Sequence, residues 1–452
     1  MSELPPKPTG WAWANLGEFA DVKLGKMLSA KARESGLKQL PYLRNQNVRW
    51  GFIDLTDVKS MGFKSGEIAR YSVQPGDLLV CEGGEPARCA VYSGPAGAFM
   101  YQKALHRIRP NALVAESRFL QYCLWHFARN GVVLPRPSET TIRHIPLEEM
   151  QALQIPLPPI AEQRRIVEAL DAQFTRLDAA VAALERVRLG LERYRGAVLQ
   201  AAVDGRLGTG LRPSGWPQVS LGDLLSDIET GRSFKCIERP PEANEVGVVK
   251  VSAVTWGEFD SDESKTCADP SLVRPDFYVK EGDFLFSRAN TINLVGACVI
   301  VRRVTRRLML SDKILRFRLR DDIGPWILLS LRSRAGRTEI ERLATGNQES
   351  MRNIGQERIR QIRIRLPPKD EQARVLPAVD LAMTSASYTD AAVAGAIERA
   401  SALRASILRL AFEGRLVSQD PHDESASVLL DRIRASRAAA PPTRKRTSRS
   451  PR

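Results

Sequence analysis

Short polar segments in the chain combine the side chains that read DNA bases. The segment LRNQNVR brings together Arg44, Asn45, Gln46, Asn47 and Arg49. Asn and Gln amides can bond adenine through two hydrogen bonds, and an Arg guanidinium can bond guanine in the same way. The segment therefore predicts a base-contacting loop. The alternative role for the same residue types is to cap the backbone of the loop itself.

Two further segments of this kind lie in the second half of the chain. FSRANTIN and ATGNQESMRN are turn-prone and stand beside runs typical of strands. Their predicted DNA-contacting residues are Arg288, Asn290, Asn347, Gln348 and Arg352. Lys103 is added to the set as a further cation.

The search for catalytic motifs is negative. The sequence has no GxxxxGK[ST] phosphate-binding loop and no HExxH metal motif. It also lacks an Asn-Pro-Pro-aromatic or Asp-Pro-Pro-aromatic tetrapeptide, the usual loop of amino-methyltransferases. The carboxylates of Asp77, Glu82 and Asp283 could form a nuclease site, but acids at turns and strand ends are the simpler interpretation. We expect no catalytic residue.

Cysteine, histidine and hydropathy patterns argue against several classes of protein. The six cysteines contain no CxxC pair, and with four histidines the chain predicts no metal site. Scattered cysteines are typical of buried thiols in a reducing compartment, which indicates the cytoplasm. The polar segment MSELPPKPTG is not a signal peptide, and no run of eighteen apolar residues predicts a membrane span.

Charge and composition indicate a globular protein with a polyanionic partner. The 67 Lys and Arg residues exceed the 52 Asp and Glu residues, which gives a net charge of +15. Such an excess favours nucleic acid as a partner. The 43% of hydrophobic residues supply an ample core, and 452 residues suggest two to four domains.

The chain is a twofold repeat with an offset of 205 to 209 residues. The matching pairs are Leu16-Gly17 with Leu221-Gly222, Gly76-Asp77 with Gly282-Asp283, Pro158-Pro159 with Pro367-Pro368, and Gly205 with Gly414. Their common order indicates a duplication. The framework repeats, whereas the polar segments differ, so the two copies are predicted to read different sequences.

Each copy begins with a globular part, residues 10–157 (the first domain) and 214–366 (the second domain). DLLVCE and DFLFSR follow Gly-Asp turns and are typical of strands. SRFLQYCLWHFARNG and GPWILLSLRSRAG predict a shared short helix. The fold class predicted for both domains is mixed α+β.

A long helical region follows each domain, at residues 158–213 and 367–417. The first is predicted to be helical over about 161–203, and its apolar residues recur at heptad spacing. The predicted seam is Leu170, Phe174, Leu177, Val181, Leu184, Leu191 and Val198 in the first helix, and Val379, Met383, Val393, Ile397 and Ile407 in the second. A single amphipathic helix on a domain is the alternative, but about 60 Å of helix exceeds what one small core covers.

The helical regions contain several irregular positions. Arg188 and Arg195 interrupt the seam of the first helix. In the second helix, Pro377 predicts a kink or a delayed start. The two helices are expected to pair antiparallel as a coiled coil, with one domain at each end. Residues 418–452 are rich in Arg, Ser and Pro and are predicted to be a disordered basic tail.

The chain resembles the specificity subunit of type I restriction-modification systems. The resemblance extends to about residue 417 and rests on LPPIAEQRRIV with LPPKDEQARVL, on the paired GRL ends, and on PYLRNQNVRWGFIDLTDVK with GDLLVCEGGE. It implies two target recognition domains that each read half of a bipartite double-stranded DNA sequence. It also implies helices that act as a ruler and dock two methyltransferase subunits, with restriction and translocase subunits joining the complex.

The resemblance further implies that S-adenosylmethionine, ATP and magnesium bind to the partner subunits and that this chain holds no cofactor. Pro377, the small residues of the second helix and the basic tail depart from the family pattern. The interpretation is a non-catalytic DNA-recognition and scaffold subunit. The alternatives are a self-contained DNA modification or cleavage enzyme and a purely structural coiled-coil adaptor.

Overall fold

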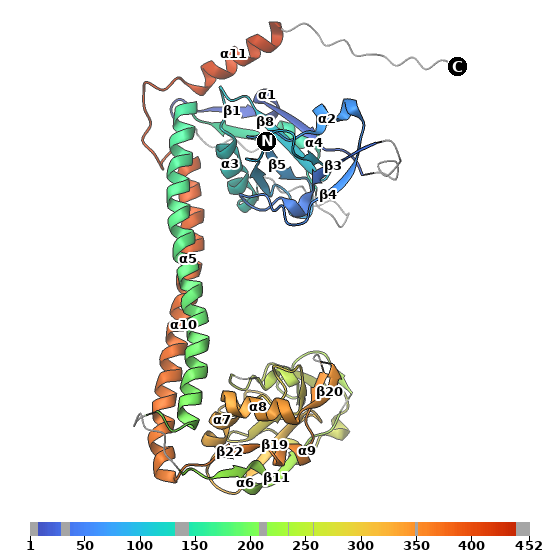
Figure 1. Ribbon diagram of the computed structural model, residues 1–452, viewed down its shortest axis with the longest axis vertical. Helices are drawn as coiled ribbons and strands as arrows, with labels where there is room; N and C mark the ends of the chain where they lie inside the picture. Colours follow the sequence, from blue (N-terminus) through green and yellow to red (C-terminus); the bar gives the residue numbers. More distant parts are fainter. Residues whose placement is uncertain are drawn as a thin grey trace, which may run out of the picture. The chain divides into compact units, whose positions relative to one another are not determined.

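The computed structural model of the protein describes residues 8–28, 37–131, 144–207, 215–233, 235–255, 257–348 and 351–439. The chain divides into two compact units, Met1–Ala182 with Ala396–Arg452, and Ala183–Gly395. Each unit contains one domain and part of both long helices (Figure 1).

The first domain is built from short strands and helices around two main sheets. Its elements are β1 (Ala12–Asn15), α1 (Leu16–Phe19), β2 (Ala20–Leu24), β3 (Lys38–Leu43), β4 (Lys59–Phe63), α2 (Ser65–Tyr71), β5 (Leu78–Cys81), β6 (Cys89–Val91), β7 (Met100–Tyr101), β8 (Leu105–Pro110), α3 (Ser117–Arg129), α4 (Leu147–Ala152) and β9 (Gln154–Leu157). The antiparallel sheet has the order β2-β8-β5-β6, and a second sheet has the order β4-β3-β7. Strand β1 pairs with β9 and so joins the two ends of the domain.

The second domain repeats this topology. Its elements are β10 (Gln218–Ser220), α6 (Leu221–Leu224), β11 (Leu225–Thr230), β12 (Cys236–Ile237), β13 (Gly247–Val249), β14 (Ser264–Cys267), β15 (Phe284–Ser287), β16 (Ala289–Asn290), β17 (Cys298–Ile300), β18 (Leu308–Met309), β19 (Ile314–Leu319), α7 (Gly324–Arg332), α8 (Arg334–Leu343), β20 (Thr345–Gln348), β21 (Met351–Asn353), α9 (Gln356–Arg360) and β22 (Arg363–Arg365).

The sheets of the two domains correspond strand by strand. The order β11-β19-β15-β17 matches β2-β8-β5-β6, and β14-β13-β18 matches β4-β3-β7, including one parallel pair in each domain. Strands β10 and β22 pair as β1 and β9 do. The duplication and the α+β fold predicted from the sequence are therefore confirmed.

A buried central strand forms the core of each domain. All four residues of β5 and of β15 are buried, because one face of the sheet packs on a helix and the other on the second sheet. A Gly-Asp turn precedes each strand, with Gly76 and Gly282 both at φ 87°. This left-handed backbone suits glycine. Helices α3 and α7 occur where the shared short helix was predicted.

The two long helices are each 44 residues long, α5 from Ile160 to Val203 and α10 from Lys369 to Phe412. At a rise of ~1.5 Å per residue, each extends about 66 Å. The delayed start predicted at Pro377 is wrong, because α10 begins eight residues earlier. Pro377 lies on an exposed face, and Val375 and Val379 on either side of it are buried. That packing holds the helix although proline removes one backbone donor.

Helices α5 and α10 run antiparallel. In the first unit, Leu170 and Phe174 of α5 share a core with Ile407 of α10. In the second unit, Val198 of α5 shares a core with Val375 and Val379 from the beginning of α10. Each of the twelve predicted seam residues is buried or half-buried.

The Arg residues that interrupt the seam have an acidic partner on the opposite helix. Asp390 of α10 lies 3.7 Å from Arg188 and 3.4 Å from Arg195. Arg195 also donates to the carbonyl of Ala386, at 3.3 Å. Polar groups at seam positions are best paired in one register, so this cluster favours a single alignment of the two helices.

The prediction of a disordered tail from residue 418 is wrong for the described part of it. Residues Ala426–Ala439 form α11, which lies beside α1 and β1 of the first domain (Figure 1). Ala426, Leu429 and Leu430 are buried in the core of that domain. The apolar residues of α11 recur at helical spacing, but the segment is also rich in Arg and Ser. The prediction of disorder followed that composition and overlooked the helical spacing. Residues 440–452 lie outside the described part.

Candidate nucleic-acid interface

The first polar segment forms a turn followed by a tight hairpin. A 3-10 turn spans Asn45–Asn47, and residues 47–54 then fold back on themselves. The amide of Asp54 donates to the carbonyl of Asn47 at 2.7 Å, and the amide of Arg49 donates to the carbonyl of Phe52 at 2.9 Å. We call residues 47–54 the 47–54 hairpin.

Two of the predicted base-contacting side chains in this segment are used to hold the loop. Asn47 is only 2% exposed, and its amide donates to the carbonyls of Asp54 and Asp57 at 2.9 and 3.0 Å. The side-chain amide of Asn45 donates to the carbonyl of Gly83 at 3.0 Å. For Asn47 the capping alternative is the one that fits, because a buried side chain cannot reach a base edge. We therefore remove Asn47 from the proposed contact set.

The remaining polar side chains of the segment reach the surface to different degrees. Arg44 bonds Gln46 and Asp57, which leaves its side chain 15% exposed. Gln46 is exposed, and the side chain of Arg49 is 47% exposed. Because β3 pairs with β7 and Gln102 donates to the carbonyl of Leu43, the exposed Lys103 is brought close to this segment.

The two polar segments of the second domain meet in one small sheet, β16-β21-β20. Asn290 pairs with Arg352 in the register of β16 and β21. Arg288 lies 3.4 Å from the side chain of Asn353, and Gln348 is exposed. Arg352 donates to the carbonyls of Gly346 and Ala344, so its guanidinium also supports the hairpin. The side chain of Asn347 lies outside the described residues.

The sequence interpretation missed the loop after β5. Arg88 donates to the carbonyl of Asn45 at 2.9 Å, and Glu85 accepts from the indole of Trp50 at 2.7 Å. This loop contains Ala87 in a left-handed backbone conformation, φ 68°. The signal in the sequence was its place directly after a buried strand, where loops carry function.

An aromatic cluster connects the 47–54 hairpin to the long helices within the first unit. Trp50 stacks on Trp125 of α3, with 5.8 Å between ring centroids, and Trp125 meets Phe174 of α5 at 5.8 Å. Arg404 of α10 lies over both Trp125 and Phe174 and forms an ion pair with Asp178. Each cation–π contact of this kind stabilises by about 0.5–2 kcal/mol. The hairpin is thus positioned relative to the helices by rigid rings.

The acidic residues near these loops are structural. Asp77 is fully buried, accepts from Arg109 at 2.6 and 2.7 Å, and accepts from the amide of Gln74. Asp283 accepts from the amide of Lys280 in the same way and pairs with Arg316 at 3.0 Å. Both carboxylates hold the Gly-Asp turn against the sheet.

Two requirements of reactive sites bear on the described residues, a cluster of metal ligands and an ionised thiol or carboxylate. No group of three or more His, Cys, Asp or Glu residues there could hold a metal ion. Burial raises the pKa of the Cys81 thiol to about 11, so the thiol stays protonated. Hydrogen bonds from Thr56 lower the pKa of Asp54, which keeps a carboxylate at the end of the 47–54 hairpin, 3.7 Å from Arg49.

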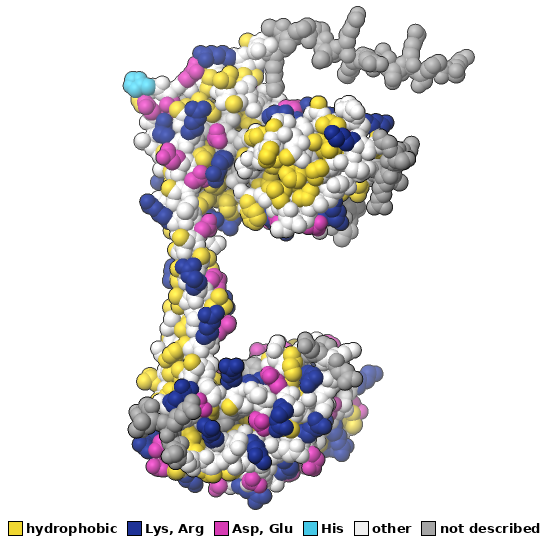
Figure 2. All heavy atoms as spheres, viewed as in Figure 1, with side chains coloured by type: hydrophobic (Ala, Val, Ile, Leu, Met, Phe, Trp, Pro, Cys, Tyr) yellow, Lys and Arg dark blue, Asp and Glu magenta, His cyan; other side chains and the backbone are white. Residues whose placement is uncertain are grey.

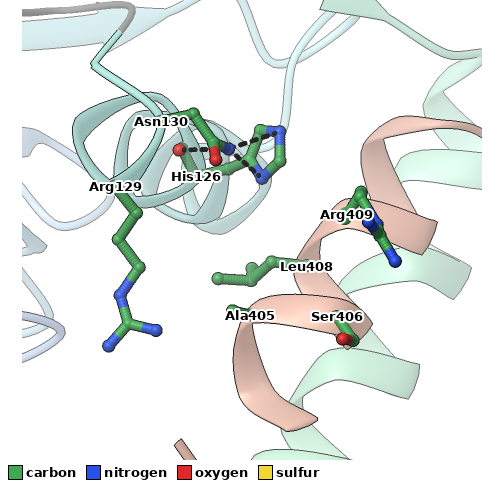
Figure 3. A pocket seen from close by; sticks show the side chains of 7 residues that line it. All are labelled: His126, Arg129, Asn130, Ala405, Ser406, Leu408 and Arg409. Carbon is green, nitrogen blue, oxygen red and sulfur yellow. Dashed lines mark hydrogen bonds between the residues drawn. The ribbon is translucent and has the colours of Figure 1, made fainter. Parts of the chain in front are cut away.

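A cavity of about 160 Å³ lies between α3 and α10. It is lined by His126, Arg129, Asn130, Ala405, Ser406, Leu408 and Arg409 (Figure 3). The side chain of Asn130 bonds the ring of His126, and burial lowers the pKa of that ring, so the histidine stays neutral. The lining contains no carboxylate or thiol, so it lacks the paired carboxylates of general acid–base catalysis.

The surface carries cations without a single basic patch on the visible face. Figure 2 shows Lys and Arg side chains scattered over both domains and along the helices. No helix in the described part of the chain is long and apolar enough to cross a membrane. Two domains of one fold with different polar segments, joined to paired helices, define a protein of duplicated modular architecture.

Known proteins share this organisation. Residues 8–185 match the type I restriction modification DNA specificity domain. The specificity subunit of the type I restriction enzyme EcoKI from Escherichia coli K12 is 26% identical, covering 96% of this chain and 97% of its own. The HsdS subunit of Thermoanaerobacter tengcongensis has a TM-score of 0.55 at 21% identity, over 92% of this chain and all of that one.

A chain from a structure described as the basis of complex assembly and conformational transition in a type I R-M system has a TM-score of 0.69. It is 20% identical and covers 91% of this chain and all of its own. Over nearly its full length the chain is therefore similar to specificity subunits of type I restriction enzymes, and its first domain lies within the part that matches the DNA specificity domain.

Proposed function

We propose that each domain reads one half of a bipartite double-stranded DNA target. The observation that carries this proposal is that one fold occurs twice with different polar surfaces. In the first domain Gln46 and Arg49 are exposed on one loop, and in the second the polar segments meet in β16-β21-β20. The proposed contact residues are Arg44, Asn45, Gln46, Arg49 and Lys103 in the first domain, and Arg288, Asn290, Asn347, Gln348 and Arg352 in the second.

In this proposal the paired helices set the unread spacer between the two half-sequences. Helix α5 is continuous over 44 residues, and the Arg188–Asp390–Arg195 cluster favours one register. A fixed helix length and a fixed register together support a fixed spacer, because a helix that slid by a heptad would move by about 10 Å.

The proposal also assigns a docking role for methyltransferase subunits to the outer face of α10. Eight residues on this face are exposed and uncharged: Pro377, Ala378, Leu381, Thr384, Ser385, Tyr388, Ala391 and Ala392. Leu381 and Tyr388 are 72% and 74% exposed. Figure 2 shows mostly hydrophobic and uncharged side chains along this stretch. Outer faces of helices normally carry charge, so this composition supports a covered face.

Catalysis is assigned to partners in this proposal. Two methyltransferase subunits and the restriction and translocase subunits would hold S-adenosylmethionine, ATP and magnesium, and this chain would position them in the cytoplasm. Among the alternatives, methyl transfer by the isolated chain would establish an enzyme, and sequence-independent action of the complex would establish an adaptor.

Methylome sequencing of a host with and without this gene tests the function. The expected result is a methylated bipartite sequence, two short specified parts around an unspecified gap, that disappears with the gene. A methylation pattern that is identical in both hosts would contradict the proposed function.

A further inference from the structure

The tip of the 47–54 hairpin carries a large aromatic side chain in solvent. Phe52 is 60% exposed, although Phe side chains are normally buried. None of the aromatic or cation–π contacts recorded within the described residues involves Phe52, whereas Trp50, two residues earlier, stacks on Trp125. The exposed ring therefore stands on a loop whose other aromatic residue is anchored.

The hairpin that carries Phe52 is fixed at both ends. At its base, Val48 is fully buried and Asn47 is 2% exposed. At its tip, the amide of Gly51 donates to the carbonyl of Cys89 at 3.0 Å, and the Trp50 indole donates to Glu85. A rigid loop loses little conformational entropy on binding, so a side chain that it presents can contribute most of its contact energy.

The side chains beside Phe52 favour DNA as the partner. Arg49 lies across the tip from Phe52, joined by the hydrogen bond from the Arg49 amide to the Phe52 carbonyl. Its guanidinium pairs with Asp54 at 3.7 Å, and its side chain is still 47% exposed. A cation next to an exposed apolar ring is the pairing with which proteins enter DNA grooves, the cation bonding phosphates or base edges and the ring packing on the bases.

We propose that Phe52 packs against bases of the DNA half-sequence read by the first domain and contributes to the choice of base there. This inference rests on the proposed function and deepens it by naming a specificity-determining residue. The ring carries no charge, so its contribution is apolar contact with the bases and is independent of counterion release.

The test compares Phe52→Ala and Phe52→Leu with wild type, each as the full chain assembled with its methyltransferase subunits. Binding is measured over a series of salt concentrations on target DNA and on DNA with a scrambled first half. Phe52→Ala is expected to weaken target binding about tenfold with an unchanged salt slope, and Phe52→Leu to lose less. Binding to the scrambled DNA should stay within about twofold.

Leu113→Ala is the matched control. Leu113 is 72% exposed and lies in the loop that bonds the end of α1, away from the hairpin. The Leu113→Ala variant should bind the target DNA and the scrambled DNA as tightly as wild type does. Thermal unfolding of Phe52→Ala should match wild type, because no buried contact is removed.

Two outcomes separate this inference from the proposed function. If wild type prefers the target DNA and the Phe52→Ala variant binds the target as tightly as wild type, the proposal about Phe52 is wrong and the proposed function stands. If wild type shows no preference for the target, the proposed function fails and this inference fails with it.

Discussion

At the scale of single residues, the side-chain types that read bases are also the types that hold loops. Asn47 accepts from the amide of Arg44 at 3.1 Å and donates to two carbonyls, so this buried side chain holds the backbone of its loop together. Gln46, beside it, is exposed. The sequence could therefore predict a polar loop but not which of its side chains reach the surface, because burial depends on strands distant in the chain.

Replacement of Asn47 by Ala should destabilise the first domain and leave base choice intact. Three hydrogen bonds are lost, and the Arg44 amide and the Asp54 carbonyl each lose a partner, which costs about 2–3 kcal/mol of unfolding free energy. Urea denaturation of the full chain measures it. Gln46→Ala, the matched surface change, should leave stability within about 0.5 kcal/mol and weaken target binding instead. Equal unfolding free energies for the two variants would show that the hydrogen bonds of Asn47 do not stabilise the domain.

At the scale of elements, heptad spacing predicted the coiled coil well, and composition predicted the C-terminal segment poorly. The seam was visible because apolar residues recur at heptad spacing from Leu170 to Val198. The partner of Arg188 and Arg195 was not, since Asp390 lies about 200 positions away and stands among small residues. Helix α11 was missed because its apolar stripe, Ala426 to Ile433, is only two turns long and ends in an Arg-rich sequence.

Deletion of residues 418–452 should destabilise the first domain, whereas deletion of 440–452 should not. The larger deletion removes the buried Ala426, Leu429 and Leu430 and the ion pair between Arg434 and Glu18 at 2.6 Å. Loss of two buried leucines alone costs about 3–6 kcal/mol. Chemical denaturation monitored by tryptophan fluorescence would resolve the difference. Unchanged stability of the longer deletion would mean that α11 does not complete the core.

A charge on the outer face of α10 should prevent partner docking without unfolding the helices. Leu381→Asp and Tyr388→Asp place a carboxylate on a face that is now uncharged and exposed, so the isolated chain should keep its stability. Assembly with methyltransferase subunits should weaken at least tenfold, since burial of an unpaired charge is costly. Mass measurement of the reconstituted complex reports how many methyltransferase subunits each variant binds. Leu113 is equally exposed and lies on the first domain, so the Leu113→Asp variant should assemble normally. Normal assembly of all three variants would show that the outer face of α10 does not dock the methyltransferase subunits.

At the scale of the whole molecule, duplication explains both what repeats and what differs. The strand orders β2-β8-β5-β6 and β11-β19-β15-β17 are the same because the buried strands and Gly-Asp turns were retained in both copies. The polar segments were free to differ because they lie outside that framework. The repeat was therefore predictable from matching residues, whereas the meeting of two segments in β16-β21-β20 was not, since about 60 residues separate them.

The central claim is that the two domains read their half-sequences independently. The direct test replaces residues 10–157 with the corresponding domain of a relative that modifies a different sequence, followed by methylome sequencing of cells that carry the chimera. One specified half should change to that of the relative, while the other half and the length of the unread gap stay as in wild type. A chimera that methylates DNA with both halves changed, or with neither changed, would contradict the account.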